Sequence, residues 1–257
     1  MKYALDLHTH TLASGHAYNT ILEMAKAASK LNLDILGITE HARSMPGTCS
    51  DFYFSNLKTV ERRLFGVEIL LGVELNLIDY DGKVDMESHI LKDMDIAIAS
   101  FHTPCIRPGT MEENTNSLVQ ACKNPYINVL GHPDDSTYPL HYETVIKAAR
   151  DTQTLIEINN SSISPQGFRK NAAANDVTIL NLCRHYNVPV VIGSDAHFMT
   201  KVGNHQYAAK ILDETGFPKE LVYNYFPDLV RPFLNKYKHG NLAGFNHGEE
   251  GAVNSIP

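Results

Sequence analysis

The sequence predicts an α/β fold of seven parallel strands with intervening helices, for which a seven-unit barrel is the simplest closure. Short, nearly continuous apolar runs alternate along the chain with longer segments of helical period, as expected for strands buried on both faces. The first run is followed by DLHTH, whereas a doubly wound dinucleotide-binding sheet would carry a glycine-rich turn at that point. These two observations favour a barrel over an open sheet.

Each element follows from a local pattern. The expected strands are KYALDL (2–7), LDILGIT (33–39), VEILLGVEL (67–75), MDIAIASF (94–101), INVLGH (127–132), TLIEIN (154–159) and VPVVIGS (188–194). The expected helices cover 19–31, 54–65, 110–122, 141–152, 171–187 and 204–214, with Asn19 and Asn204 as N-caps of the first and last. Only LNLIDYDGKVD (75–85) breaks the alternation, and its D-G pair predicts a small hairpin.

The length of 257 residues accommodates one large domain, which we place at residues 1–238. The remainder, 239–257, is rich in Gly and Asn without periodicity and is expected to be a flexible tail. A net charge of −7 and the lack of a basic run argue against a nucleic-acid partner. No segment has the length of an apolar membrane span, and the first residues lack a signal-peptide core, so a cytoplasmic location is expected.

The cysteines are four and lie far apart in the chain, with no C-x-x-C pair. They are Cys49, Cys105, Cys122 and Cys183. This spacing predicts reduced thiols with a structural role rather than a disulfide framework. The oligomeric state is left open by the sequence.

Histidines and carboxylates follow all the expected strands except the sixth. They are His8, His10 and His16 after the first strand, His41 after the second, Glu74 at the end of the third, His102 and His132 after the fourth and fifth, and Asp195 and His197 after the seventh. In α/β barrels the C-terminal ends of the strands meet at one mouth, where active sites are built. Neutral imidazole and carboxylate are ligands of zinc and similar metals, so the pattern predicts a metal site there.

Other ligand-type residues have less specific positions. His89, His141, His185 and His205 lie away from the strand ends, and His239 and His247 lie in the tail, so a structural role is expected for all six. Asp6 points the same way as His8 and would either orient a metal-bound histidine or make a structural hydrogen bond. Glu157 would be either a carboxylate of the inner barrel layer or part of a buried salt bridge.

Six motifs, DLHTHT, ITEH, GVE, FH, GHP and GSDAH, occur in this order over nearly the full chain. Together they resemble the PHP (polymerase and histidinol phosphatase) superfamily, and ASGHAYNT (13–20) and LIEINNSS (155–162) resemble its YcdX-like group of stand-alone phosphatases. The resemblance implies a distorted (β/α)7 barrel with three metal ions, usually zinc, at the C-terminal mouth of the strands.

The resemblance also implies how the nine ligands are shared. His8, His10, Glu74 and Asp195 would hold one ion, Glu74, His102 and His132 a second, and His16, His41 and His197 a third, with Glu74 as the bridge. Glu74, Asp195, His102 and His132 are the expected catalytic residues. Two motifs depart from the family pattern: Glu40 stands where Asp is more usual, and Asp134-Asp135 follow His132-Pro133 and are expected to face solvent rather than substrate.

Three divalent ions against two carboxylates and a hydroxide would leave a charge of roughly +3, which favours a phosphate group as substrate. We therefore expect a metal-dependent phosphatase that hydrolyses a small phosphorylated metabolite, a monoester, by attack of a metal-bridging hydroxide. Zinc fits best, although manganese or iron accepts similar ligands. Arg43, Arg107 and Lys201 lie in loops after strands and are candidates for phosphate binding. The alternatives are a phosphodiesterase or nuclease using the same site, or a non-catalytic metal-binding protein.

Overall fold

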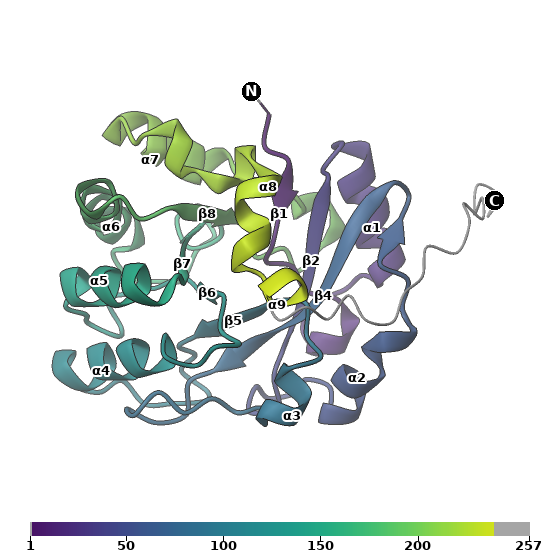
Figure 1. Cartoon of the computed structure of the whole chain (residues 1–257), viewed down its shortest axis with the longest axis horizontal. Coiled ribbons are helices and arrows are strands. Elements are labelled where there is room, and N and C mark those ends of the chain that lie inside the picture. Colours follow the sequence, from purple (N-terminus) through teal and green to yellow (C-terminus); the bar gives the residue numbers. More distant parts are fainter. Residues whose placement is uncertain (1, 239–257) are drawn as a thin grey trace.

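A computed structural model describes residues 2–238 of the chain. The predicted tail at 239–257, with His239 and His247, lies outside the described residues. Within the part described, seven parallel strands form a nearly closed barrel surrounded by helices, so the predicted α/β barrel is confirmed (Figure 1). None of the helices in this part is both long enough and apolar enough to span a membrane.

The strands follow one another around the barrel in chain order. They are β1 (Leu5–Asp6), β2 (Ile35–His41), β4 (Val67–Asn76), β5 (Ala97–Ser100), β6 (Val129–Leu130), β7 (Leu155–Asn159) and β8 (Val190–Gly193). A parallel bridge between Thr9 and Ala196 joins the two end strands just beyond their C-terminal ends. The amide of His10 donates to the carbonyl of Ala196 over 2.9 Å, so the closure lies directly at the mouth.

The helices lie outside the strands, and Figure 1 shows α4, α5, α6 and α7 in succession along one side. Their bounds are α1 (Ile21–Lys30), α2 (Asp51–Asn56), α3 (Ser88–Leu91), α4 (Met111–Ala121), α5 (Tyr142–Thr152), α6 (Ala172–Tyr186), α7 (Gln206–Thr215), α8 (Pro227–Val230) and α9 (Asn235–Lys238). Thr20 and Thr110 cap α1 and α4, each in a capping box with a glutamate three residues later.

Three local expectations need correction. The predicted helix at 54–65 ends early, because Arg63–Leu64 form a short strand, β3, that pairs antiparallel with β4 around Phe65 and Gly66. The predicted cap Asn19 is not the N-cap of α1, since Thr20 takes that place and the Asn19 side chain accepts a hydrogen bond from the amide of Met199. Likewise the residue before α7 is His205 rather than Asn204. The hairpin at 75–85 is present as a bridge between Leu77 and Val84.

The inside of the barrel has an apolar half and a polar half. Leu70 on β4, Ile98 on β5 and Val191 on β8 belong to one buried cluster that fills the N-terminal half. Because alternate residues of a strand share a face, the same faces continue to Glu74, His102 and Asp195. Glycines stand between the two halves: Gly37, Gly72, Gly131 and Gly193. At Gly193 an added Cβ would lie 1.9 Å from Glu157 Oε1 and 3.0 Å from His8 Cβ, so this strand has no room for a side chain.

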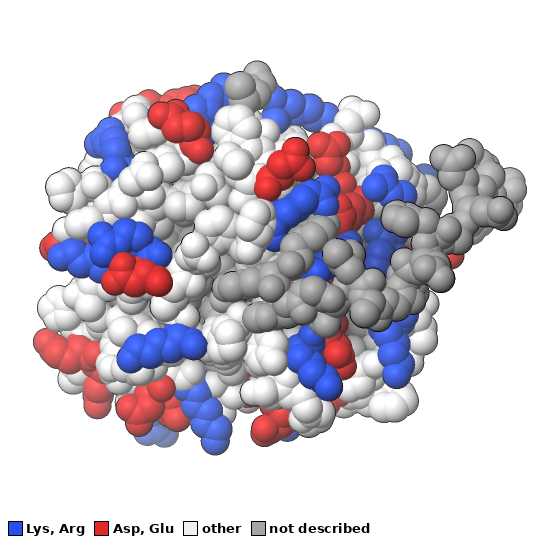
Figure 2. All heavy atoms as spheres, viewed as in Figure 1, with Lys and Arg blue, Asp and Glu red and all other residues white. Residues whose placement is uncertain are grey.

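The last described segment covers the N-terminal end of the barrel, where α8 and α9 cross the strands in Figure 1. Val230 and Leu234 pack into the inner apolar cluster. Lysines and arginines lie beside acidic side chains on this face of the molecule (Figure 2). Arg231 contacts Glu68 of β4 over 2.9 Å and is one of the ion pairs that fasten the segment. The described residues beyond α7, up to residue 238, are therefore part of the barrel structure.

The four cysteines are free, as expected from their spacing. Burial raises the pKa of Cys49 to about 11 and that of Cys105 to about 12, which keeps both thiols protonated at neutral pH.

Candidate metal centre

Glu74 lies at the centre of the mouth, fully buried at the end of β4. Its Oε1 is 2.9 Å from His132 Nε2 and 3.2 Å from His102 Nε2. Its Oε2 is 2.8 Å from His41 Nδ1 and 3.3 Å from His8 Nε2. One carboxylate thus faces imidazoles from four different strand ends, as a bridging ligand would.

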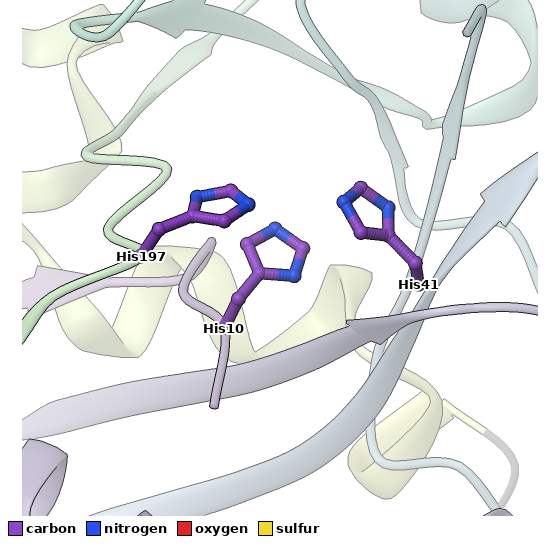
Figure 3. Close-up of side chains that lie close together, drawn as sticks. All are labelled: His10, His41 and His197. Atoms are coloured by element: carbon purple, nitrogen blue, oxygen red, sulfur yellow. The ribbon is translucent and has the colours of Figure 1, made fainter. Parts of the chain in front are cut away.

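The remaining predicted ligands surround this carboxylate. His10 Nε2 is 3.4 Å from both Glu74 Oε2 and Asp195 Oδ1. The rings of His10, His41 and His197 point toward one another (Figure 3), and the ring of His16 lies 4.9 Å from that of His41 and 4.8 Å from that of His197. All nine predicted ligands therefore lie together at the mouth.

Three groups have ligand atoms within 4.8 Å of one another: His10, His41 and His197; His8, His10 and Glu74; and His41, Glu74 and His102. These groups overlap with the three implied sets without being identical to them, because His10 and His41 each belong to two groups. His16, His132 and Asp195 of the predicted ligands belong to none of these groups, and neither do His89, His141, His185 and His205.

Four buried atoms in this cluster have no partner in hydrogen-bond geometry, although His41 Nδ1 lies 2.8 Å from Glu74 Oε2: His8 Nε2, His10 Nε2, His41 Nδ1 and Glu74 Oε2. Buried polar atoms are nearly always paired, because leaving one unpaired costs about 1–3 kcal/mol. Here the four unpaired atoms converge on the same small region. Their chemistry, imidazole nitrogen and carboxylate oxygen, is that of a transition-metal site, so the residues present fit metal ions.

The orientation of His8 is fixed by Glu157, whose Oε1 accepts from His8 Nδ1 over 2.7 Å. The other oxygen, Oε2, accepts from the backbone amide of His132 over 2.8 Å and from the side chain of Asn159. Glu157 is therefore a carboxylate of the inner layer, and its contact with His8 is also a buried ion pair when His8 is protonated, so both of its expected roles have support. With its Nδ1–H held in this way, His8 presents the Nε2 lone pair to the centre, as metal-bound histidines do.

A serine and a glutamate orient His10. Its Nδ1 lies 3.0 Å from Ser14 Oγ, and that hydroxyl donates to Glu40 Oε2 over 2.6 Å. Since Ser14 gives its proton to Glu40, it accepts from His10 Nδ1–H, and Nε2 is left as the acceptor nitrogen. Glu40 also accepts from the amide of Thr11 over 3.0 Å. The extra methylene of Glu40 is accommodated because the carboxylate acts through Ser14.

His102 and His197 are oriented by amide oxygens. Asn76 Oδ1 lies 2.8 Å from His102 Nδ1, and the Asn76 amide nitrogen donates to Asp85 over 2.7 Å, which identifies Oδ1 as the acceptor. The backbone carbonyl of Asp195 lies 3.0 Å from His197 Nδ1. In both histidines the remaining ring nitrogen, Nε2, is therefore the one available to a metal.

Two groups of the cluster have the charge states of metal ligands. Burial acts to raise the pKa of Glu74, but the neighbouring imidazoles, above all that of His102, hold it well below its usual range. Burial and the rings of His41 and His197 hold the pKa of His10 well below its usual range. The carboxylate is therefore ionised and this imidazole neutral at pH 7, the forms that bind metal.

A cavity of about 410 Å³ opens over this cluster and is bordered by His16, His41, His102, His197 and Asp195. Its buried cation is Arg169, which sequence reasoning missed. The guanidinium donates to Asp195 Oδ2 over 3.3 Å and to Ser162 Oγ over 2.9 Å. Burial opposes its charge, but Asp195 and Asp134 outweigh burial and raise the pKa of Arg169. Arg169 follows β7 in a loop, and extending the search for loop cations to that loop would have found it.

The three candidates for phosphate binding do not border this cavity. Arg43 donates to the carbonyl of Asp85 over 2.7 Å and pairs with Asp51 over 3.2 Å. Arg107 and Lys201 are exposed. The structure thus places a different arginine beside the cluster.

Two aspartates differ from expectation or resolve an alternative. Asp6 accepts hydrogen bonds from the amides of Ser194 and Gly203 over 3.0 and 2.8 Å. It therefore has the structural role, which was one of the two roles predicted for it. Asp134 does not face solvent: it is fully buried, and burial raises its pKa to about 7. Asp135, next to it, borders the cavity.

Comparison with known proteins places this geometry in a family. A model of the PHP domain matches residues 6–163. A protein from Clostridium novyi (strain NT) named as a probable phosphatase is 46% identical over 224 residues, covering 87% of this chain and 91% of its own. Another probable phosphatase, from Clostridium acetobutylicum, is 40% identical over 246 residues and covers 96% of this chain and 99% of its own.

The fold also matches a solved structure. The histidinol phosphate phosphatase of Lactococcus lactis subsp. lactis Il1403, in complex with zinc, L-histidinol and phosphate, superimposes with a TM-score of 0.58 and 15% identity, covering 85% of this chain and 95% of that one. The family model and the two relatives, each similar over most of its length, show that this chain belongs to the PHP domain family.

Proposed function

We propose that this protein is a metal-dependent phosphatase that hydrolyses a small phosphate monoester at three divalent metal ions, most favourably zinc. The observation that carries the proposal is the convergence of four unpaired, fully enclosed ligand atoms on one region of the mouth. The side chains that would hold the ions are His8, His10, His16, His41, Glu74, His102, His132, Asp195 and His197. Nine ligands over three ions leave positions open for water and substrate, as catalytic sites require.

Bound divalent ions would supply Lewis acidity, activating water and neutralising the charge of a phosphoryl group. The chain's own residues keep the ligands in place for this task. Glu157, Ser14 and Asn76 fix the rings of His8, His10 and His102, so that each presents one defined nitrogen. This preorganisation means that little rearrangement is needed when substrate binds.

We assign phosphate binding to Arg169 rather than to Arg43, Arg107 or Lys201. Its guanidinium borders the cavity beside Asp195, one of the four residues proposed to be catalytic with Glu74, His102 and His132. Arginine presents a planar fork of N–H donors that matches two phosphate oxygens. A permanently charged donor at the cavity wall would hold the monoester with its phosphorus toward the ligand cluster.

The comparisons support the proposed phosphatase activity. The relatives from both clostridia are named probable phosphatases, and the Lactococcus lactis enzyme was solved with zinc and phosphate. The clustering of imidazoles around one carboxylate favours zinc over magnesium or calcium, which prefer all-oxygen sites.

The test is elemental analysis of the purified protein combined with hydrolysis of p-nitrophenyl phosphate before chelation, after chelation and after metal is restored. The expected result is about three metal ions per chain, with activity lost on chelation and regained with zinc. Three ions without monoester turnover would overturn the proposal in favour of a diesterase, assayed with bis-p-nitrophenyl phosphate, or a non-catalytic metal protein. A metal content near zero after reconstitution would remove the metal site itself.

A further inference from the structure

Part of the cavity wall is apolar. This apolar wall is formed by Met45, Phe101, Pro104, Tyr138 and Phe168. The cavity, about 410 Å³, falls in the size range of pockets that bury whole small organic ligands. A phosphoryl group would occupy only the part beside the histidines and Arg169. The remaining volume is therefore available to the alcohol portion of a monoester.

Two aromatic rings of this wall are rigidly held. The rings of Phe101 and Tyr138 stack with centroids 4.5 Å apart and an angle of 6° between their planes. The Tyr138 hydroxyl donates to the carbonyl of Ile106 over 2.7 Å, and the residue is only 2% exposed. Phe101 directly precedes the proposed ligand His102, so the flat surface is fixed relative to the metal centre.

Phe168 also belongs to this wall. In contrast to the buried Tyr138, it is 82% exposed although it borders the cavity. The guanidinium carbon of its neighbour Arg169 lies 5.2 Å from the ring centroid. The aromatic ring is thus adjacent to the cation assigned to phosphate. An apolar ligand in the cavity would cover exposed apolar surface of Phe168, which is favourable in proportion to the area removed from water.

The lining of the cavity also carries negative charge. Asp135 borders it, with Oδ1 held by the backbone amides of Thr137 and Lys170 over 2.9 and 3.0 Å. Among the described residues that border the cavity, the only lysine or arginine is Arg169, which is already assigned to the phosphate. A second anionic group on the substrate would meet Asp135 rather than a cation, and like charges repel in a partly enclosed site.

We infer that the site selects phosphate monoesters whose alcohol carries an aromatic or other flat apolar group and no second anionic group. The flat group would lie against Phe101 and Phe168, with Tyr138 stacked against Phe101, while the phosphate faces Arg169 and the histidines. This inference rests on the proposed phosphatase function, which it sharpens by naming the substrate class.

The test compares benzyl phosphate with ethyl phosphate, because both release a primary alcohol and differ mainly in the aromatic ring. The metal-loaded protein is expected to show a kcat/KM for benzyl phosphate about tenfold higher. Phe168→Ala is expected to lower kcat/KM for benzyl phosphate about fivefold and for ethyl phosphate by less than about twofold. Phe52→Ala is the matched control, since Phe52 is 77% exposed but does not border this cavity, and neither substrate should be affected.

A binding measurement separates this inference from the proposed function. Benzylphosphonate is expected to bind the metal-loaded protein about tenfold more tightly than ethylphosphonate by calorimetry. Equal turnover of the two esters and equal binding of the two phosphonates would overturn the inference while leaving the phosphatase function standing. Absence of turnover for both esters would overturn the function, and the phosphonate preference would then decide the inference alone. Use of 4-carboxybenzyl phosphate as efficiently as benzyl phosphate would overturn the part assigned to Asp135.

Discussion

The two ends of the barrel differ in whether their buried polar side chains form hydrogen bonds. At the N-terminal end, Asn224 and Asn128 satisfy their side-chain amides completely: Asn224 accepts from the amide of Ile192 over 2.6 Å, and Asn128 donates to Asn235 over 2.8 Å. At the mouth, atoms such as His8 Nε2 and Glu74 Oε2 are equally buried but unpaired. Paired groups stabilise the fold, whereas unpaired ones cost stability and are retained for what they bind. The comparison therefore separates a structural end from a functional end.

The largest expected effect comes from Glu74→Gln at the functional end. The neutral amide cannot bridge cations as the carboxylate does, so we expect monoester turnover to fall about a thousandfold or more. The melting temperature of the metal-free protein should fall, because the neighbouring imidazoles hold the pKa of Glu74 low and its ionised carboxylate therefore stabilises the folded chain at pH 7. Steady-state kinetics, metal content and thermal melts check both parts. Full activity with a full metal content would show that Glu74 is not the bridge.

The next effect concerns the cavity cation. Arg169→Met is expected to lower kcat/KM for phosphate monoesters about a hundredfold, because a charged, two-pronged contact to phosphate is lost. Arg107→Met, at an exposed position, should stay within about twofold of the unaltered protein. If Arg107→Met lowered kcat/KM and Arg169→Met did not, phosphate binding would be assigned to Arg107, as the sequence suggested.

Metal removal tests the functional end without mutation. Because the ions would bind the folded chain and not the unfolded one, chelation should lower Tm by about 10 °C. Glu74→Gln should show a much smaller shift, whereas Asn224→Ala should retain the full shift from a lower starting Tm. An unchanged Tm on chelation of metal-loaded protein would contradict a metal centre of this size.

The structural end is tested by Asn224→Ala itself. The substitution leaves the carbonyl of Leu5 and the backbone of Ile192 without their partners. We expect a loss of about 2–4 kcal/mol in the free energy of unfolding, with kcat at 25 °C nearly unchanged. Denaturant titration measures the first and kinetics the second. A large fall in kcat together with unchanged stability would show that the two ends are not separate.

The smallest effect is a pH dependence. Burial, with Asp134 nearby, raises the pKa of Asp176 on α6 well above its usual range. In the unfolded chain this carboxyl ionises near pH 4, so above about pH 4 the folded chain binds more protons and its stability falls as pH rises toward the folded pKa. Asp176→Asn cannot ionise and should raise Tm by a few degrees at pH 8 and by less at pH 5. An equal gain at both pH values would contradict this linkage.

The barrel and the convergence of nine side chains could be predicted from the sequence, because both follow from the periodic alternation of residues along strands and of strands with helices. Residues two apart on a strand share a face, and parallel strands end at one mouth, so Glu74 and Asp195 could be placed together without coordinates. Arg169 could not be placed in this way, since it lies in an irregular loop whose path depends on contacts with Ser162 and Asp195. Burial of Asp134 was missed for the same reason, because its neighbours come from α6.

Gly193 has a consequence for how members of this family diverge. A side chain at this position would collide with Glu157 and His8, so a substitution there would misalign a ligand while every histidine and acid of the ligand set stays in the sequence. A descendant could thus lose its chemistry and still display an intact set of motifs. To judge whether a related protein has kept the activity, the glycine at position 193 should therefore be checked as well as the ligands.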